Sequence, residues 1–141
     1  MRLAGGEVTG RWNGSQGEVE VVGVRARIAY VRMAGVAEQA AGRVIERALT
    51  QVFMGAESLD TFWDLRDLVN YHSDVRVLST NVLLANRRKL QSVHTLSTSK
   101  IVAMGIAVAN LALGGIITNH KTPQSFEFAI RAVLPAGTSV E

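Results

Sequence analysis

Residues 61–76 read Thr61-Phe-Trp-Asp-Leu-Arg-Asp-Leu-Val-Asn-Tyr-His-Ser-Asp-Val-Arg76, and this stretch decides the fold. The apolar strand pattern of Leu59 to Leu65 stops here at polar residues, and apolar residues then return at helical spacing. A strand, a turn and a helix in this order form the repeating unit of α/β sheets, and sites are usually built at such turns. The stretch therefore predicts an α/β fold with its candidate site at the turn.

The composition is that of one compact domain. With 141 residues, of which 48% are hydrophobic and 19% charged, the chain is expected to form a single domain over residues 1–141, with 1–16 and 135–141 as loose ends. The net charge of +3 is spread out, and the one basic run, Arg87-Arg88-Lys89, fits the last turn of a predicted helix, so no nucleic-acid partner is expected. The absence of cysteine excludes disulfides and thiolate chemistry. The segment from Met1 to Glu7 lacks the apolar core of a secretion signal, which predicts a cytoplasmic location.

The longest apolar run covers residues 101–117, with Asn110 as its one interruption among polar residues. It falls short of the roughly twenty apolar residues that a spanning helix needs, and Gly114-Gly115 breaks it. The polar residues 97–100 before it are suited to a helix N-cap. We therefore predict no membrane span, but a buried helix followed by a buried strand at 115–119.

Strand and helix patterns alternate along the rest of the chain. Two or three antiparallel strands are expected over residues 6–12 and 17–33, with a turn at Asn13-Gly14. The elements expected after them are helix 36–54, strand 59–65, helix 74–90, strand 93–96, helix 100–113, strand 115–119 and a helix opened by Thr122-Pro123. This order predicts an α/β fold with a mixed β-sheet, about four helices, an antiparallel start and parallel βαβ crossovers.

With this order of elements the chain resembles the STAS superfamily, and especially its SpoIIAA-like branch of anti-sigma-factor antagonist-like domains with a SEC14-like sheet-and-helix arrangement. The resemblance spans roughly residues 18–134. Residues 63–75 occupy the place of the family's strand that ends in an aspartate, serine, serine, glycine turn, and residues 93–119 match its strand, apolar helix and strand. The resemblance implies a non-catalytic signalling or scaffolding domain that acts by protein–protein interaction and needs no cofactor.

His72-Ser73-Asp74-Val75 stand where the antagonists carry the phosphorylated serine and a glycine. In a gap-free placement Asp74 falls on the phosphoacceptor, so that a fixed carboxylate replaces a switchable phosphate. A shift by one residue makes Ser73 the phosphoacceptor instead. The sequence leaves both placements open, and it also leaves open that Ser73 and Asp74 only cap the helix.

The expected contact surface is the turn of residues 70–76 with the helix that follows. The resemblance implies a protein partner, an anti-sigma-type kinase or another regulator, for this surface. Its candidate residues for interaction or switching are Asn70, His72, Ser73, Asp74 and Arg76.

Other combinations of polar residues give no catalytic or metal site along the sequence. Asp64 and Asp67 are three residues apart on a strand and point to opposite faces, which excludes an acid–base pair. His94 and His120 can meet in space, but no carboxylate spacing supports a metal site beside them. No local motif assembles a nucleophile, a base and an orienting group, so no enzyme is expected, although distant residues can still come together in the fold.

Two further functions stay open. The SEC14-like resemblance implies binding of a lipid or another apolar ligand, and the small residues of the segment 101–115 leave room for a pocket beside helix 100–113. A homodimer through an exposed strand or helix face is the other alternative.

Overall fold

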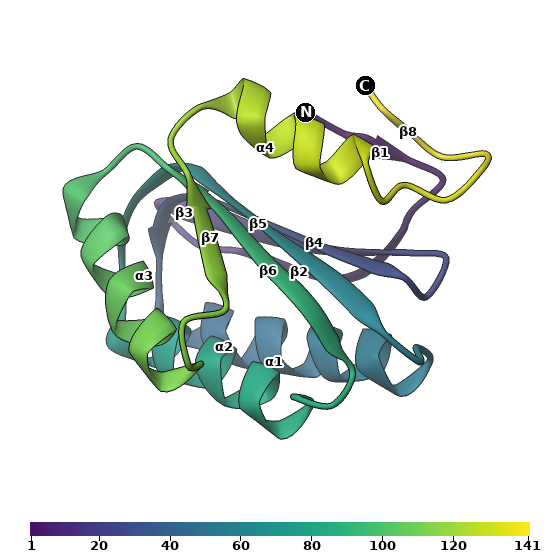
Figure 1. Ribbon diagram of the computed structural model, residues 1–141. Helices are drawn as coiled ribbons and strands as arrows, with labels where there is room; N and C mark the ends of the chain where they lie inside the picture. The colour runs from purple at the N-terminus through teal and green to yellow at the C-terminus, as the bar shows by residue number, and fades with distance from the viewer.

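The fold is a mixed β-sheet with helices on both of its faces, as a computed structural model of residues 1–141 shows. In chain order the elements are β1 Leu3–Ala4, β2 Glu7–Asn13, β3 Gly17–Val24, β4 Ile28–Ala37, α1 Gln39–Met54, β5 Leu59–Tyr71, α2 Ser73–Ala85, β6 Leu90–Ser97, α3 Lys100–Ala112, β7 Ile117–His120, α4 Pro123–Arg131 and β8 Ser139–Val140. Helices α1, α2 and α3 lie on one side of the main sheet and α4 lies on the other (Figure 1).

The main sheet has six strands in the order β2-β3-β4-β5-β6-β7. The pairs β2–β3 and β3–β4 are antiparallel, and the pairs from β4 to β7 are parallel. Each parallel connection carries one helix, first α1, then α2 and α3. The predicted fold class is confirmed: a mixed sheet, four helices, an antiparallel start and parallel βαβ crossovers.

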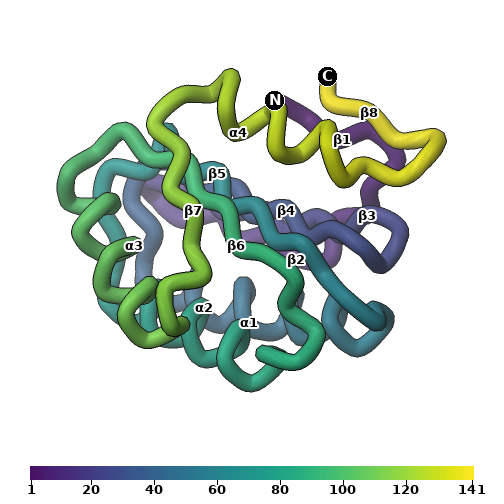
Figure 2. The backbone as a smooth tube through the Cα atoms, viewed as in Figure 1, coloured from purple at the N-terminus to yellow at the C-terminus, as the bar shows by residue number.

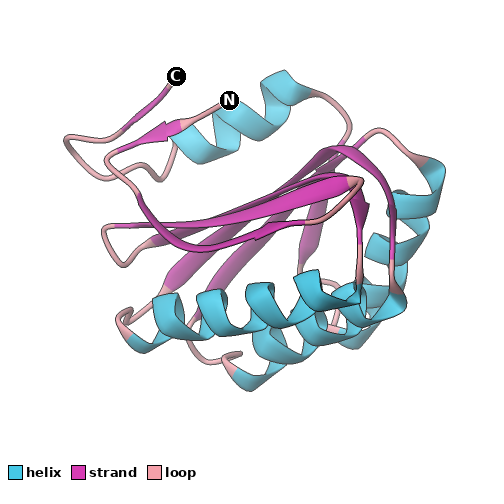
Figure 3. Ribbon diagram, turned by 180° about the vertical axis from the view of Figure 1, so that it is seen from behind, coloured by secondary structure: helices cyan, strands magenta, loops and turns pink.

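Two apolar clusters fill the space on either side of the sheet. The larger has 25 buried residues under α1, α2 and α3, and the smaller has nine under α4. Successive residues of β5 supply the two clusters in turn, because Trp63 packs toward α1–α3 and Phe62 toward α4. Figure 3 shows the resulting layers, with three helices on one side of the strands and α4 on the other.

Strand β5 is longer than its apolar pattern suggested. It continues through residues 66–71, which were expected to form a polar turn and in which Leu68 is buried, and this half pairs with β4 up to Ala37↔Tyr71. The partner on the other side, β6, ends at the pair Leu65↔Ser97. Beyond that point β5 has a neighbour on one side alone, so polar side chains can stay in water without leaving the strand.

The start of α1 and the end of α2 also differ from the prediction. Helix α1 begins at Gln39 rather than at residue 36, because Val36 and Ala37 still pair with β5. Helix α2 ends at Ala85 rather than at residue 90, so the basic run 87–89 lies beyond its last turn. Lys89 instead donates a hydrogen bond of 2.8 Å from Nζ to the carbonyl oxygen of Phe53, and thus serves the C-terminal end of α1.

Helix α3 is covered on one face only, which corrects the expectation of a buried helix. Its N-cap is Ser99, as the polar residues 97–100 predicted. Toward the sheet it buries Val102, Gly105 and Ile106. On the outer face, four apolar side chains are 50–85% exposed: Ile101, Met104, Val108 and Leu111. The strand after it, β7, is the half-exposed edge of the sheet rather than a buried strand. None of the four helices is long and apolar enough to cross a membrane.

The two ends of the chain meet beside α4, on the same side of the main sheet. Strands β1 and β8 form a separate antiparallel pair with the register Leu3↔Val140, and Figure 2 shows the two ends close together next to α4. Their side chains add to the cluster under α4. The segments 1–16 and 135–141, expected as loose ends, contain this pair and strand β2.

A glycine holds the irregular end of β4 against β5. Gly35 has φ = 71° and lies at a register shift opposite Leu68. A Cβ atom at Gly35 would clash with the backbone carbonyl of Gln16. Both the backbone angle and the close approach therefore require glycine.

We expect Gly35→Ala to lower the free energy of unfolding by more than the roughly 1–2 kcal/mol that a left-handed conformation costs a side chain. Gly114→Ala is the matched control, because Gly114 has φ = 73° but no atom within 4 Å of the added Cβ. The measurement is urea unfolding of both variants. Equal losses would show that the contact with residue 16 contributes nothing.

Candidate functional site

The predicted turn lies where α2 starts, next to the start of α1. His72 is the N-cap of α2, and its Nδ1 accepts a hydrogen bond of 3.1 Å from the amide of Asp74. Ser73, expected as the cap, is the first residue of the helix instead, because His72 is still extended, with φ −69° and ψ 142°. The exposed Ser73 side chain makes no hydrogen bond within the chain.

Asp74 connects the two helix starts. Its Oδ2 accepts a hydrogen bond of 2.7 Å from Nε2 of Gln39, the first residue of α1. Gly42 in α1 allows the close approach, because a Cβ there would come within 3.1 Å of the Asp74 carbonyl oxygen. The carboxylate thus lies at the positive ends of two helix dipoles, both of which stabilise its charge. The side chain remains 42% exposed, so an outside group can still reach it.

The other two predicted residues lie apart from this group. Asn70 belongs to β5, and its Oδ1 accepts a hydrogen bond of 2.9 Å from the amide of Tyr71. Arg76, one turn into α2, lines a cavity between α2, α3 and the sheet. The structure therefore brings together His72, Ser73 and Asp74 and adds Gln39, which sequence reasoning missed because it lies 35 residues away.

The cavity beside α3 is small and apolar. It offers about 80 Å³ to the centre of a water molecule, and 13 of its 18 lining residues are hydrophobic, Trp63 and Ile106 among them. Gly105 and Ala109 line it from α3, as the small residues there suggested. One polar atom stands out: the Ser79 hydroxyl is buried at this cavity without a hydrogen-bond partner. Sites for drug-sized ligands enclose roughly 300–1,000 Å³, so the space suits a small group rather than a lipid.

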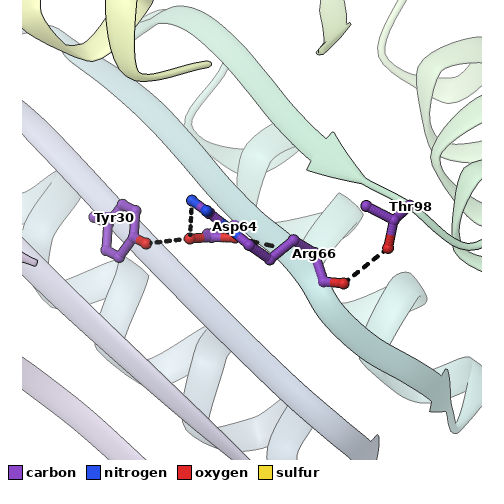
Figure 4. A network of polar contacts seen from close by, with 4 residues as sticks. All are labelled: Tyr30, Asp64, Arg66 and Thr98. Atoms are coloured by element: carbon purple, nitrogen blue, oxygen red, sulfur yellow. Dashed lines mark hydrogen bonds and ion pairs between the residues drawn. The ribbon is translucent and has the colours of Figure 1, made fainter. Parts of the chain in front are cut away.

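A network of polar groups around the buried Asp64 ties β4 to β5 on the α4 side, and sequence reasoning missed it (Figure 4). Asp64 is 3% exposed and accepts a hydrogen bond of 2.6 Å from the Tyr30 hydroxyl. Arg66 donates to both carboxylate oxygens, at 3.0 and 3.1 Å. The Thr98 hydroxyl donates to the Arg66 carbonyl oxygen at 2.9 Å. Asp67 is exposed and takes no part, in keeping with the exclusion of an Asp64–Asp67 pair.

This network is a fixed ion pair rather than an acid–base centre. Burial, together with the hydrogen bond to Asp64, raises the pKa of Tyr30 well above its usual value. Burial alone would raise the pKa of Asp64, but the hydrogen bonds from Arg66 and Tyr30 hold it below its usual value. The bond to Asp64 also raises the pKa of Arg66. None of the three groups changes its charge near neutral pH, so the network holds strands together and transfers no proton.

Two histidines meet on the α4 side of the sheet, which their positions in the sequence left open. Nδ1 of His94 on β6 lies 2.9 Å from Nε2 of His120 on β7, and Nδ1 of His120 lies 2.6 Å from the hydroxyl of Ser125 on α4. The His94 ring stacks between the rings of Phe62 and His120, at centroid distances of 4.8 and 5.1 Å. The edge of Phe126 packs against Phe62 and His120. The sequence did not predict the contact of Ser125 with His120, because a turn separates the two residues.

Both histidines favour the neutral state. Burial lowers the pKa of His94, and the neighbouring His120 lowers it further. Burial also lowers the pKa of His120. Two neutral imidazoles can share one hydrogen bond, whereas two imidazolium ions would repel each other.

Comparison with known proteins identifies the fold. No family model and no curated protein matches the sequence. Among solved structures, the unphosphorylated form of the anti-sigma factor antagonist SpoIIAA is similar to this chain, with a TM-score of 0.55 and 13% sequence identity. The match covers 83% of this chain and 99% of the SpoIIAA chain. The expected resemblance to SpoIIAA is thus confirmed, and at this identity it concerns the fold alone.

The lowered pKa values of His94 and His120 predict a loss of stability in mild acid. In the unfolded state histidine titrates near its ordinary pKa of about 6.5. At mildly acidic pH the unfolded state therefore binds more protons than the folded state does. The folded state keeps its full stability above about pH 6.5. As the pH falls toward the folded-state pKa values of the two histidines, the free energy of unfolding decreases by no more than about 1.4 kcal/mol per pH unit for each histidine.

Urea unfolding between about pH 7.5 and about pH 5.5 measures this slope. The double variant His94→Gln/His120→Gln, which has no imidazole at either position, is expected to give a flatter dependence on pH. The same slope in both proteins would assign the effect to other groups.

Proposed function

We propose that this chain is a regulatory domain, of signalling or scaffolding type, which acts by protein–protein interaction through the turn 70–76 and helix α2. The observation that carries the proposal is the carboxylate of Asp74, held at the starts of α1 and α2 and still open to solvent. Residues 1–141 act as one domain, and this surface binds its partner without catalysis.

The physical basis is a charge in a fixed position. Gln39 orients one oxygen of Asp74, and the positive ends of the two helix dipoles attract its negative charge. A basic side chain of a partner can pair with the remaining acceptor positions without reorganising the domain, which favours binding. Exposed apolar side chains of the neighbouring β5 and α2 can supply the contact area around this charge: Val69, Val77 and Leu84.

The fold suggests the class of partner. A solved structure with this fold is an anti-sigma factor antagonist in its unphosphorylated form. If the role follows the fold, the partner is an anti-sigma-type kinase or a related regulator, and the chain works beside it in the cytoplasm. Asp74 then provides a permanent negative charge, and Ser73, exposed beside it, is the hydroxyl that a kinase can modify.

Charge variants of Asp74 test the surface. We expect Asp74→Ala to weaken partner binding by about 1.5–3 kcal/mol, the contribution of a hydrogen bond to a charged group, and Asp74→Lys to abolish it by repulsion. The chain is used as bait in extracts of its own cells, the captured protein is identified by mass spectrometry, and its affinity is measured by calorimetry.

Two further variants serve as controls. Asp74→Asn can keep the hydrogen bond to Gln39, so it removes the charge with little effect on the fold. Glu57→Lys makes the same change of charge as Asp74→Lys, but on an exposed residue at the opposite end of the sheet. This variant is expected to bind the partner normally. Unchanged capture of the same protein by Asp74→Ala and Asp74→Lys would overturn the site assignment.

A second candidate function is binding of a small apolar ligand in the cavity beside α3. The unpartnered hydroxyl of Ser79 favours it, because a buried polar atom without a partner costs about 1–3 kcal/mol, which a ligand acceptor can recover. The ligand expected from this lining is a compact apolar molecule with one hydrogen-bonding group.

Phenol and benzene distinguish this function from an ordinary packing defect. We expect both to raise the melting temperature, as ligands of a native cavity do, and phenol to raise it more because its hydroxyl can bond to Ser79. In Ser79→Ala the preference for phenol should disappear. The absence of any shift with either compound would leave the cavity without a ligand role.

A further inference from the structure

The pair His94–His120 and the hydroxyl of Ser125 form a continuous chain of hydrogen bonds that neither the fold nor the proposed contact surface uses. It lies on the α4 face of the sheet, whereas the helices that flank the turn 70–76 lie on the other face. The links measure 2.6 Å from Ser125 Oγ to His120 Nδ1 and 2.9 Å from His120 Nε2 to His94 Nδ1. Both lie in the range for a nucleophile, its base and a group that orients the base.

Packing fixes the two rings. Phe62, His94 and His120 form a continuous stack with tilts of 8° and 25° between neighbouring rings. Phe126 packs against His120 in an edge-to-face arrangement, with 5.8 Å between the two ring centroids. The imidazole that contacts Ser125 therefore cannot turn away without breaking this stack, which is the pre-organisation that a base needs.

The proton positions follow from the geometry. If Nδ1 of His120 accepts the proton of Ser125, Nε2 of His120 carries a proton and donates it to Nδ1 of His94. Burial and the neighbouring His120 lower the pKa of His94 against the opposing effect of Asp60 on β5, and burial lowers the pKa of His120. Both imidazoles are therefore available in the neutral state that a base requires.

Ser125 itself is accessible and well placed. It is exposed in the first turn of α4, where its amide donates to the Thr122 hydroxyl at 3.2 Å. The amide of the preceding residue, Gln124, has no acceptor in the chain. The positive end of the α4 dipole stabilises an oxygen that gains negative charge beside Ser125.

We infer that Ser125 is a nucleophilic modification site, which accepts an acyl group from a small activated ester or thioester with His120 as base and His94 as positioning residue. Oγ of Ser125 attacks the carbonyl carbon, and the bond from this carbon to the leaving oxygen or sulfur breaks. The proton of Ser125 passes to Nδ1 of His120 and then to the leaving alcohol or thiol. The product is an ester on Ser125, and no oxidant or reductant takes part.

A single thiol tests the pairing of residue 125 with its base. The chain has no cysteine, so Ser125→Cys introduces one thiol, and Ser139→Cys gives a matched control at an exposed serine on β8. The rate of alkylation by iodoacetamide against pH reports the pKa of each thiol. We expect a pKa near the ordinary value of about 8.5 for Ser139→Cys and a clearly lower one for Ser125→Cys.

Removing each histidine in the Ser125→Cys background assigns the roles. His120→Gln should return the thiol to the behaviour of the control, and His94→Phe, which keeps a ring in the stack, should move the pH profile part of the way. His120→Asn replaces His120→Gln if circular dichroism shows that the latter is unfolded. Equal pH profiles for Ser125→Cys and Ser139→Cys would overturn the inference.

The acylation itself is tested with 4-nitrophenyl acetate on the unaltered chain. We expect one acetyl group per chain, mapped to Ser125 by peptide mass spectrometry, and no such label in Ser125→Ala. Ser139→Ala should be labelled normally, and His120→Gln should react about a hundred-fold more slowly, in the range that a lost general base costs. Equal labelling of Ser125→Ala and the unaltered chain would also overturn the inference.

Discussion

The rest of the structure depends on the unequal pairing of strand β5. Its first half has β4 on one side and β6 on the other, so its side chains fill both apolar clusters. Its second half has β4 alone, extends past the end of β6 and carries polar residues into solvent. Helix α2 starts from this extension, and for that reason His72, Ser73 and Asp74 lie at the surface beside the start of α1.

The buried network lies at the point where β6 leaves β5. Leu65 is the last residue of β5 that pairs with β6, and the Arg66 carbonyl oxygen then takes its hydrogen bond from Thr98 instead of a strand. The side chain of Arg66 turns back to neutralise Asp64, which offsets part of the cost of burying that charge. The proposed contact surface and the ion pair both lie where β6 ends beside β5.

Local signals predicted what depends on neighbours in sequence. The order of elements, the cap at Ser99 and the start of α4 at Pro123 followed from hydrophobic period and capping residues. Prediction failed where residues distant in the sequence determine the local structure. Pairing with β4 makes residues 66–71 a strand. The position of α3 at the edge of the sheet leaves one of its faces uncovered. At the candidate site His72, Ser73 and Asp74 were found together, whereas Gln39, and the contact of His120 with Ser125, arise from the fold.

The pairing of β1 with β8 brings the first and last residues of the chain to one point, where the amide of Arg2 donates to the carbonyl of Glu141. A domain with this arrangement can be inserted into a surface loop of a host protein without forcing the two sides of that loop apart. Equally, a short linker can join the ends, and new termini can be opened at the exposed turn between β2 and β3. The permuted chain would keep every parallel crossover of the sheet, because that turn joins antiparallel strands.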